Sequence, residues 1–138
     1  MPTNPDPVNC TLKVEGDKYA VRIFKAETRK HRFDGAFCQA YFPVPLDVED
    51  QDAWCFGHWG TEWGAFNVDN LRSKRIDDMT ESLSMTFVCK NSPPTVALYE
   101  LSKRITVVTF TLSFTHTNKP LAATYVIHDG KIATEVKV

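Results

Sequence analysis

The chain of 138 residues is long enough for one domain whose core needs neither a metal nor a disulfide for stability. Its 43% hydrophobic and 24% charged residues argue against a disordered chain or a coiled coil. The 16 basic residues nearly balance the 17 acidic ones, giving a formal net charge of -1. We therefore expect neither nucleic acid nor an anionic membrane surface as a partner.

The N-terminus, MPTNPDPVN, is polar and rich in proline, and it lacks the basic and apolar regions of a secretory signal. No apolar run in the chain approaches the roughly 20 residues that a membrane-spanning helix needs. We predict a flexible tail over residues 1–9, a single α+β domain over residues 10–138, and a cytoplasmic location without a membrane partner.

The residue spacing provides no metal or cofactor motif. The cysteines form no CxxC pair, and the four histidines show no HxH or HExxH spacing. The sequence also lacks a GxSxG motif, a P-loop and a GxGxxG motif, which removes the usual support for serine hydrolysis and for nucleotide chemistry. We expect no metal, no cofactor and buried free thiols. The cysteines are Cys10, Cys38, Cys55 and Cys89.

The segment from residue 11 to residue 42 supports two interpretations. Apolar residues alternate on both sides of EGDK, a pattern that predicts a hairpin. Residues 19–27 also fit one helical face, with Asp17 available as the N-cap. Farther on, Phe33, Phe37 and Tyr41 have helical spacing with Asp34 near the start, so we predict a short helix that ends before the prolines of PVPLDV.

The clearest helical pattern covers residues 68–83, VDNLRSKRIDDMTESL. Its apolar residues fall near one stripe, its charged residues cover the remaining faces, and Asn67 or Asp69 can cap the free amides. We therefore predict a helix here. The stripe consists of Val68, Leu71, Ile76, Met79 and Leu83.

From Ser84 onward the chain is rich in Val, Ile, Thr, Tyr and Phe and is divided by turn residues, so we predict strands. Asp129-Gly130 predicts a tight hairpin turn. Over residues 108–116 apolar side chains alternate with threonine and serine, which indicates an antiparallel sheet covered by helices on one side. The predicted strands are SMTFVCKN, TVALYELSK, RITVVTFTLSFTH, LAATYVIH and KIATEVKV.

The C-terminal third resembles the end of SnoaL-like polyketide cyclases in the nuclear transport factor two superfamily. The matching motifs are THTNKP at residues 115–120, in which Asn118 replaces a glycine of the family pattern, and DGKI at residues 129–132. The resemblance implies a cone-like α+β fold, in which a curved antiparallel β-sheet wraps around N-terminal helices, and a homodimer through the open sheet face. The hairpin-like pattern near the N-terminus keeps an all-β lipocalin-like barrel or sandwich as the alternative.

The stretch WCFGHWGTEWGAF, residues 54–66, is the main candidate for a site. His58 and Glu62 are flanked by Trp54, Trp59 and Trp63, so aromatic burial can shift their pKa values toward neutrality, as general acid–base catalysis requires. In the alternative interpretation, the tryptophans are core or interface residues and the glycine-rich segment exposes His58 and Glu62 to water.

Other residues complete the predicted pocket. His116 ends a predicted strand and is a third catalytic candidate, although a histidine in this position is more commonly solvated. Tyr41, Phe66, Tyr99 and Tyr125 are candidate substrate-binding residues. The resulting hypothesis is a cofactor-free isomerase, cyclase or dehydratase of secondary metabolism that acts on a small apolar substrate. The alternative hypothesis is a non-catalytic ligand-binding or oligomerisation module.

Overall fold

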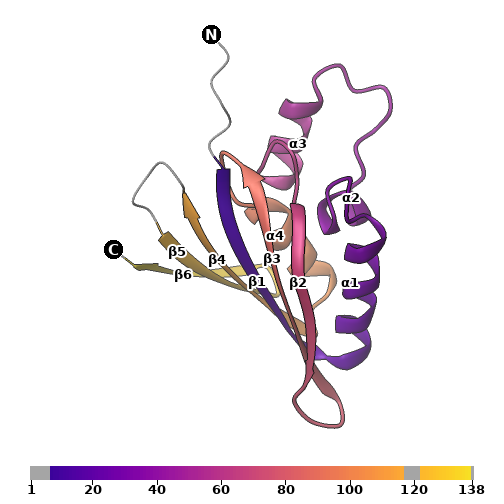
Figure 1. Ribbon diagram of the computed structural model, residues 1–138, viewed down its shortest axis with the longest axis vertical. Helices are drawn as coiled ribbons and strands as arrows, with labels where there is room; N and C mark the ends of the chain where they lie inside the picture. The colour runs from indigo at the N-terminus through magenta and orange to yellow at the C-terminus, as the bar shows by residue number, and fades with distance from the viewer. Residues whose placement is uncertain (1–6, 117–121, 138) are drawn as a thin grey trace.

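The computed structural model of the protein describes residues 7–116 and 122–137 (Figure 1). These residues form six strands and four helices. In chain order the elements are β1 (Pro7–Asp17), α1 (Lys18–Lys30), α2 (Phe37–Tyr41), α3 (Gln51–Trp59), β2 (Phe66–Arg75), β3 (Thr80–Lys90), α4 (Thr95–Arg104), β4 (Val108–His116), β5 (Ala122–His128) and β6 (Lys131–Lys137).

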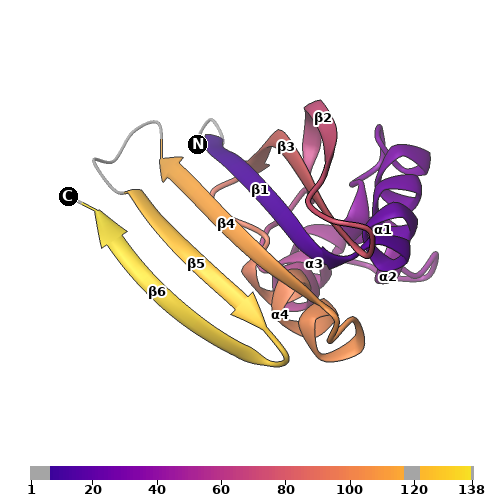
Figure 2. The same cartoon turned by 90° about the horizontal axis from the view of Figure 1, so that it is seen from below.

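The strands form one antiparallel sheet with the order β2-β3-β1-β4-β5-β6. The first four strands and the helices between them have the βαββαβ connectivity of ferredoxin-like domains, and the β5–β6 hairpin extends the sheet beyond β4. Figure 2 shows the helices gathered on one face of this sheet.

This architecture confirms the α+β prediction, and it shows that the all-β barrel alternative is wrong. In the described ranges, β2 and β6 each pair on one side only, so the sheet stays open. The cone-like wrap around N-terminal helices is not confirmed. None of the helices in the part of the chain described here is long and apolar enough to cross a lipid bilayer.

The predicted tail over residues 1–9 is wrong at its C-terminal end, because β1 already begins at Pro7. Val8 is fully buried, and it pairs with Cys89 on one side and with His116 on the other. Every second side chain of β1 faces the helices, and this alternation includes Val8 and Cys10. Burial of Val8 therefore anchors a segment whose composition resembles a loose tail. Residues 1–6 lie outside the described ranges.

The ambiguous segment after residue 11 is a strand followed directly by a helix, so the hairpin interpretation is wrong. The Asp17 side chain caps α1 by accepting a hydrogen bond from the Ala20 amide at 3.0 Å, as the helical interpretation predicts. Val21 and Phe24 form the buried side of α1, whereas Tyr19 points outward. The predicted second helix is confirmed over Phe37–Tyr41 only.

The helix predicted over residues 68–83 is wrong, because these residues form the β2–β3 hairpin. Asn67 and Asn70 both have a φ of 53°, and the β2–β3 register shifts at two places in this region. Ile76 and Met79 of the supposed apolar stripe are exposed near the hairpin tip. Of the charges that resembled the polar side of a helix, Arg72 and Lys74 lie on the exposed edge strand β2. Asp77 and Asp78 lie in the hairpin turn, and Glu81 is buried on β3.

The strand predicted for TVALYELSK is also wrong, since residues 95–104 form α4. Ala97, Leu98 and Leu101 are fully buried, and their spacing matches one side of a helix. The preceding prolines start this helix instead of separating two strands, because proline is well tolerated at a helix N-terminus.

The remaining predicted strands are confirmed as the second part of β3 and as β4, β5 and β6. Asp129 and Gly130 have φ values of 46° and 72°, and they connect the paired residues His128 and Lys131, as predicted for a tight hairpin. Apolar residues of β4 alternate with half-buried ones, which confirms a single helix-covered face. The turn around Asn118 lies outside the described residues.

The core between the sheet and the helices is rich in aromatic residues. The ring of Phe24 lies 5.5 Å from Phe37 and 5.5 Å from Phe110, and Phe37 packs edge-on against Phe87 at 5.6 Å. All four cysteines are buried in the same core, as expected. These contacts join α1 and α2 to β3 and β4.

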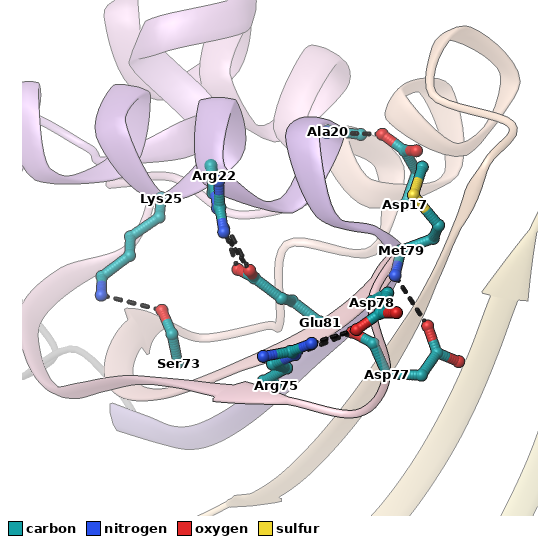
Figure 3. A network of polar contacts seen from close by, with 10 residues as sticks. All are labelled: Asp17, Ala20, Arg22, Lys25, Ser73, Arg75, Asp77, Asp78, Met79 and Glu81. Carbon is teal, nitrogen blue, oxygen red and sulfur yellow. Dashed lines mark hydrogen bonds and ion pairs between the residues drawn. The ribbon is translucent and has the colours of Figure 1, made fainter.

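A polar network connects α1 to the β2–β3 hairpin (Figure 3). The Arg22 guanidinium donates to both carboxylate oxygens of Glu81, with the shortest distance at 2.6 Å, and Lys25 donates to Ser73 at 2.8 Å. The backbone amide of Lys18 donates to the Met79 carbonyl at 2.9 Å. The hydrogen bond from Arg22 lowers the pKa of Glu81 below its usual value of 4.5.

Replacing Glu81 with Gln is expected to destabilise the protein at neutral pH and to reduce its sensitivity to acid. Because the pKa of Glu81 is lowered by folding, its stabilising effect is present above the pKa of the unfolded chain and is lost as the pH falls. Chemical denaturation from about pH 7 down to about pH 3 measures this difference. The control Glu100→Gln, which breaks an exposed pair with Lys103, changes stability by less than about 0.5 kcal/mol. An unchanged acid sensitivity in Glu81→Gln contradicts the assignment.

Two glycine-to-alanine substitutions are expected to have opposite effects. A Cβ at Gly16 would lie 2.1 Å from the Val107 carbonyl oxygen, so we expect Gly16→Ala to lower the free energy of unfolding by more than about 2 kcal/mol. A Cβ at Gly57, within α3, meets nothing within 4 Å, and Gly57→Ala should stabilise the helix by about 0.5–1 kcal/mol. Thermal unfolding measures both, and a stable Gly16→Ala variant contradicts the predicted clash.

Candidate functional site

The aromatic stretch from Trp54 to Phe66 contains most of α3, a tight turn and the first residue of β2. Asp50 caps α3 by accepting a hydrogen bond from the Ala53 amide at 3.0 Å. Gly60 ends the helix in the left-handed conformation with a φ of 86°. A Cβ at Gly60 would lie 2.9 Å from the Val96 amide nitrogen, so the turn packs closely against the start of α4. The turn that begins at Gly60 is therefore compact.

Trp59 is the fixed centre of this region. Its side chain is 2% exposed, and the indole nitrogen donates a hydrogen bond to the Phe42 carbonyl at 2.9 Å. Two glycines leave space for the ring, since a Cβ at Gly64 would lie 3.0 Å from it and a Cβ at Gly35 would lie 3.6 Å from it. Trp54 meets Trp59 edge-on at 5.9 Å. The orientation of Trp59 is thus set by packing and by one polar contact.

An open cavity of about 470 Å³ lies beside Trp59. It is bordered by the loops before and after α2, by α3 and by the start of β2. Its wall contains the aromatic residues Phe33, Trp59, Trp63 and Phe66 and the polar residues Asp34, Gln39, Gln51, Asp52 and Glu62. Trp63 is 42% exposed and packs against Phe66 at 5.4 Å, whereas Phe33 is 95% exposed.

Glu62 is held in its ionised form at the edge of the cavity. Its carboxylate accepts a hydrogen bond from the Asn91 side chain at 3.0 Å and pairs with the Lys90 ammonium at 3.1 Å. These two contacts, the Asn91 hydrogen bond first, lower the pKa of Glu62. The same ammonium lies 3.8 Å from Asp52 and 4.6 Å from the centre of the Trp63 ring. Lys90 therefore connects two carboxylates and one aromatic wall of the cavity.

His58 does not share this cavity with Glu62. Its exposed ring stacks on Trp54 with centroids 4.0 Å apart, and Nδ1 lies 2.8 Å from the Trp54 carbonyl oxygen. Trp59 and Glu62 line the cavity, but His58 is absent from its wall. The arrangement therefore separates the two side chains that the sequence paired as acid and base.

The other predicted site residues are dispersed over the fold and do not line this cavity. His116 lies at the end of β4 with its ring 5.9 Å from Phe114, and Tyr125 contacts the same phenylalanine at 5.3 Å. Tyr99 on α4 lies under the Lys103 ammonium. Tyr41 stacks on Phe24 at 6.0 Å, and burial raises the pKa of its hydroxyl. Of the predicted residues, the cavity thus brings together Trp59, Trp63, Phe66 and Glu62.

Several cavity residues were not identified from the sequence. Phe33 and Asp34 lie in the turn between α1 and α2 and Asp52 lies in α3, and only the fold brings them to the same cavity as Trp63. One local signal was available, because Asp50 followed by QDAW is a helix-capping pattern that places Asp52 in the first turn of α3. No comparable signal marks Asp34 or Phe33.

A second cavity of about 470 Å³ lies on the sheet at β1, β3, β4 and β5. Its wall includes hydroxyl groups from adjacent strands, among them Thr11, Thr86, Ser113 and Thr124. Ser113 and Thr124 are hydrogen-bonded to each other at 3.0 Å. This surface corresponds to the predicted threonine-rich face of β4.

Comparisons with known proteins show that a large part of this fold also occurs in a solved structure. No family model matches the chain, and no curated protein matches it. Among solved structures, it is similar to protein api92 from Yersinia pseudotuberculosis, of the family DUF1281, with a TM-score of 0.50 and 14% sequence identity. The match covers 67% of this chain but 32% of api92, so the chain spans about a third of that protein's length. At this identity the likeness concerns the fold alone.

Substitutions of Trp59 and Trp63 should have different effects on the free energy of unfolding, because Trp59 is buried and Trp63 is half exposed. Trp59→Phe removes the hydrogen bond to Phe42 and leaves empty volume, so we expect it to lower the free energy of unfolding by about 1–3 kcal/mol. Trp63→Phe, at a half-exposed position, should change it by less than about 0.5 kcal/mol. Chemical denaturation measures both values, and equal effects would contradict the anchoring role of Trp59.

Proposed function

We propose that the protein is a non-catalytic ligand-binding domain whose cavity beside α2 and α3 takes a small molecule with an apolar, ring-sized body. The observation that carries this proposal is the aromatic wall of the cavity, built around the fixed ring of Trp59. Cavities of several hundred Å³ with apolar walls and a few polar groups are typical of small-molecule sites.

The wall is largely ordered before a ligand arrives. Trp59 is held by burial and a hydrogen bond, and Trp63 contacts both the Phe66 ring and the Lys90 ammonium. Rigid aromatic side chains lose little conformational entropy when a ligand packs against them. Preorganisation of this kind favours binding by surface complementarity.

Binding agrees better with the cavity than acid–base catalysis does. A general acid or base works best with a pKa near the operating pH, whereas the pKa of Glu62 is lowered and burial raises the pKa of the Cys55 thiol to about 11. No histidine or tyrosine occurs among the described residues that line the cavity. The isomerase, cyclase or dehydratase activity stays a prediction, as do SnoaL-like membership, a cytoplasmic location and a homodimer.

The three tryptophans provide an internal test of ligand binding, because each gives a separate indole N–H signal in a ¹⁵N-correlated NMR spectrum. We expect a neutral aromatic probe, 2-phenylethanol, to shift the Trp59 and Trp63 signals most, since both rings line the cavity, and to shift the Trp54 signal least.

One substitution inside the cavity and one outside it complete the test. Trp63→Ala removes part of the wall and should weaken probe binding at least fivefold, corresponding to about 1 kcal/mol. Phe56→Ala removes an exposed aromatic side chain of α3 that does not line the cavity, so it serves as the matched control. Unchanged Trp59 and Trp63 signals, or equal effects of the two variants, would contradict the proposed site.

A further inference from the structure

We infer that the cavity selects a ligand carrying a positive charge, an alkylammonium or guanidinium group attached to an aromatic or apolar body. This inference rests on the proposed ligand-binding function and adds the charge of the ligand to it. Three features of the wall carry it together, namely its aromatic rings, its carboxylates and the position of Lys90.

The carboxylates of the wall come from three separate segments. Asp34 precedes α2, Asp52 lies in the first turn of α3, and Glu62 lies in the turn before β2. The described residues that line the cavity include no lysine, arginine or histidine. The wall is therefore negatively charged around an open volume.

Nearby basic groups only partly compensate for this charge. Lys90 lies next to the wall with 17% of its side chain exposed, and its single ammonium is shared between Glu62 at 3.1 Å and Asp52 at 3.8 Å. His31 contacts Asp34 at 3.2 Å and is a full counter-charge only when protonated. The Arg32 guanidinium lies 5.9 Å from the centre of the Phe33 ring. Two permanent cations near three carboxylates leave the wall with a net negative charge at neutral pH.

The aromatic rings of the wall favour an organic cation over a hydrated metal ion. The face of an aromatic ring attracts a cation, and the Lys90 ammonium already occupies such a position 4.6 Å from the Trp63 ring centre. Phe33, almost fully exposed, presents a further ring at the cavity. Small hydrated metal ions gain little from apolar walls, whereas an ammonium with an aromatic body gains from both rings and carboxylates. Anions are repelled by the same carboxylates.

Three probes of similar size and different charge test the inference at about pH 7. They are 2-phenylethylamine, a cation, 2-phenylethanol, which is neutral, and 3-phenylpropanoate, an anion. We expect the amine to bind at least tenfold more tightly than the alcohol and the anion to bind most weakly, with the shifts of the Trp59 and Trp63 indole signals as readout. The advantage of the amine should shrink as salt is added.

Charge-neutralising variants test whether the carboxylates of the cavity wall cause the preference for a cation. Asp52→Asn should reduce the amine-to-alcohol ratio of affinities about threefold or more. Asp34→Asn should reduce the same ratio, and it tests the charge at a position outside α3. Asp47→Asn is the matched control, because this exposed acidic residue lies on the loop before α3 but does not line the cavity.

The outcomes distinguish the two proposals. Equal binding of all three probes at the Trp59 and Trp63 signals overturns the charge preference and leaves the ligand-binding function intact. Failure of every probe to shift those signals overturns the ligand-binding function and the inference together. A preference for the amine that Asp52→Asn and Asp34→Asn do not reduce, or that Asp47→Asn reduces equally, overturns the placement of the cation in this cavity.

Discussion

The burial of β1 in the middle of the sheet is the constraint on which the rest of the structure depends. This strand pairs with β3 and β4 over nearly its whole length, and every second side chain from Val8 to Val14 faces the helices. The chain then turns directly into α1, whose cap is the last residue of β1. The position of α1 over the sheet, and of the aromatic core beneath it, follows from this central pairing.

The candidate site is located at a distance from that centre, in the long connection between α1 and β2. In a plain βαββαβ arrangement one helix is sufficient for this connection, whereas here α2, α3 and the loop between them are added. The added segment is held in place by the buried Trp59 and by the ion pair of Glu62 with Lys90, the last residue of β3. The sheet thus supplies a rigid support, and the inserted helices supply the wall of the cavity.

Sequence patterns predicted the structure correctly where the pattern depends on the local backbone geometry alone. Alternation in β4 and the Asp129-Gly130 turn depend on local geometry, so both were predicted correctly. The region of β2 was mistaken for a helix because an exposed edge strand carries as many charges as the outer side of a helix. In α4, Val96 and Tyr99 favour strands locally, and tertiary burial of Leu98 prevailed over that preference. Part of the candidate site was predictable, because Trp59, Glu62, Trp63 and Phe66 lie within one stretch of sequence. Phe33, Asp34 and Asp52 come from other segments, and only the fold brings them to the cavity.

The two asparagine kinks in β2 have a consequence for the behaviour of the protein at high concentration. An exposed edge strand with regular pleating offers its backbone groups to a second chain and can start sheet-to-sheet aggregation. Here the left-handed residues Asn67 and Asn70 interrupt the regular spacing of those groups, and exposed charges such as Arg72 and Lys74 follow directly. The irregular backbone and the charges of β2 therefore make it a poor template for intermolecular strand addition.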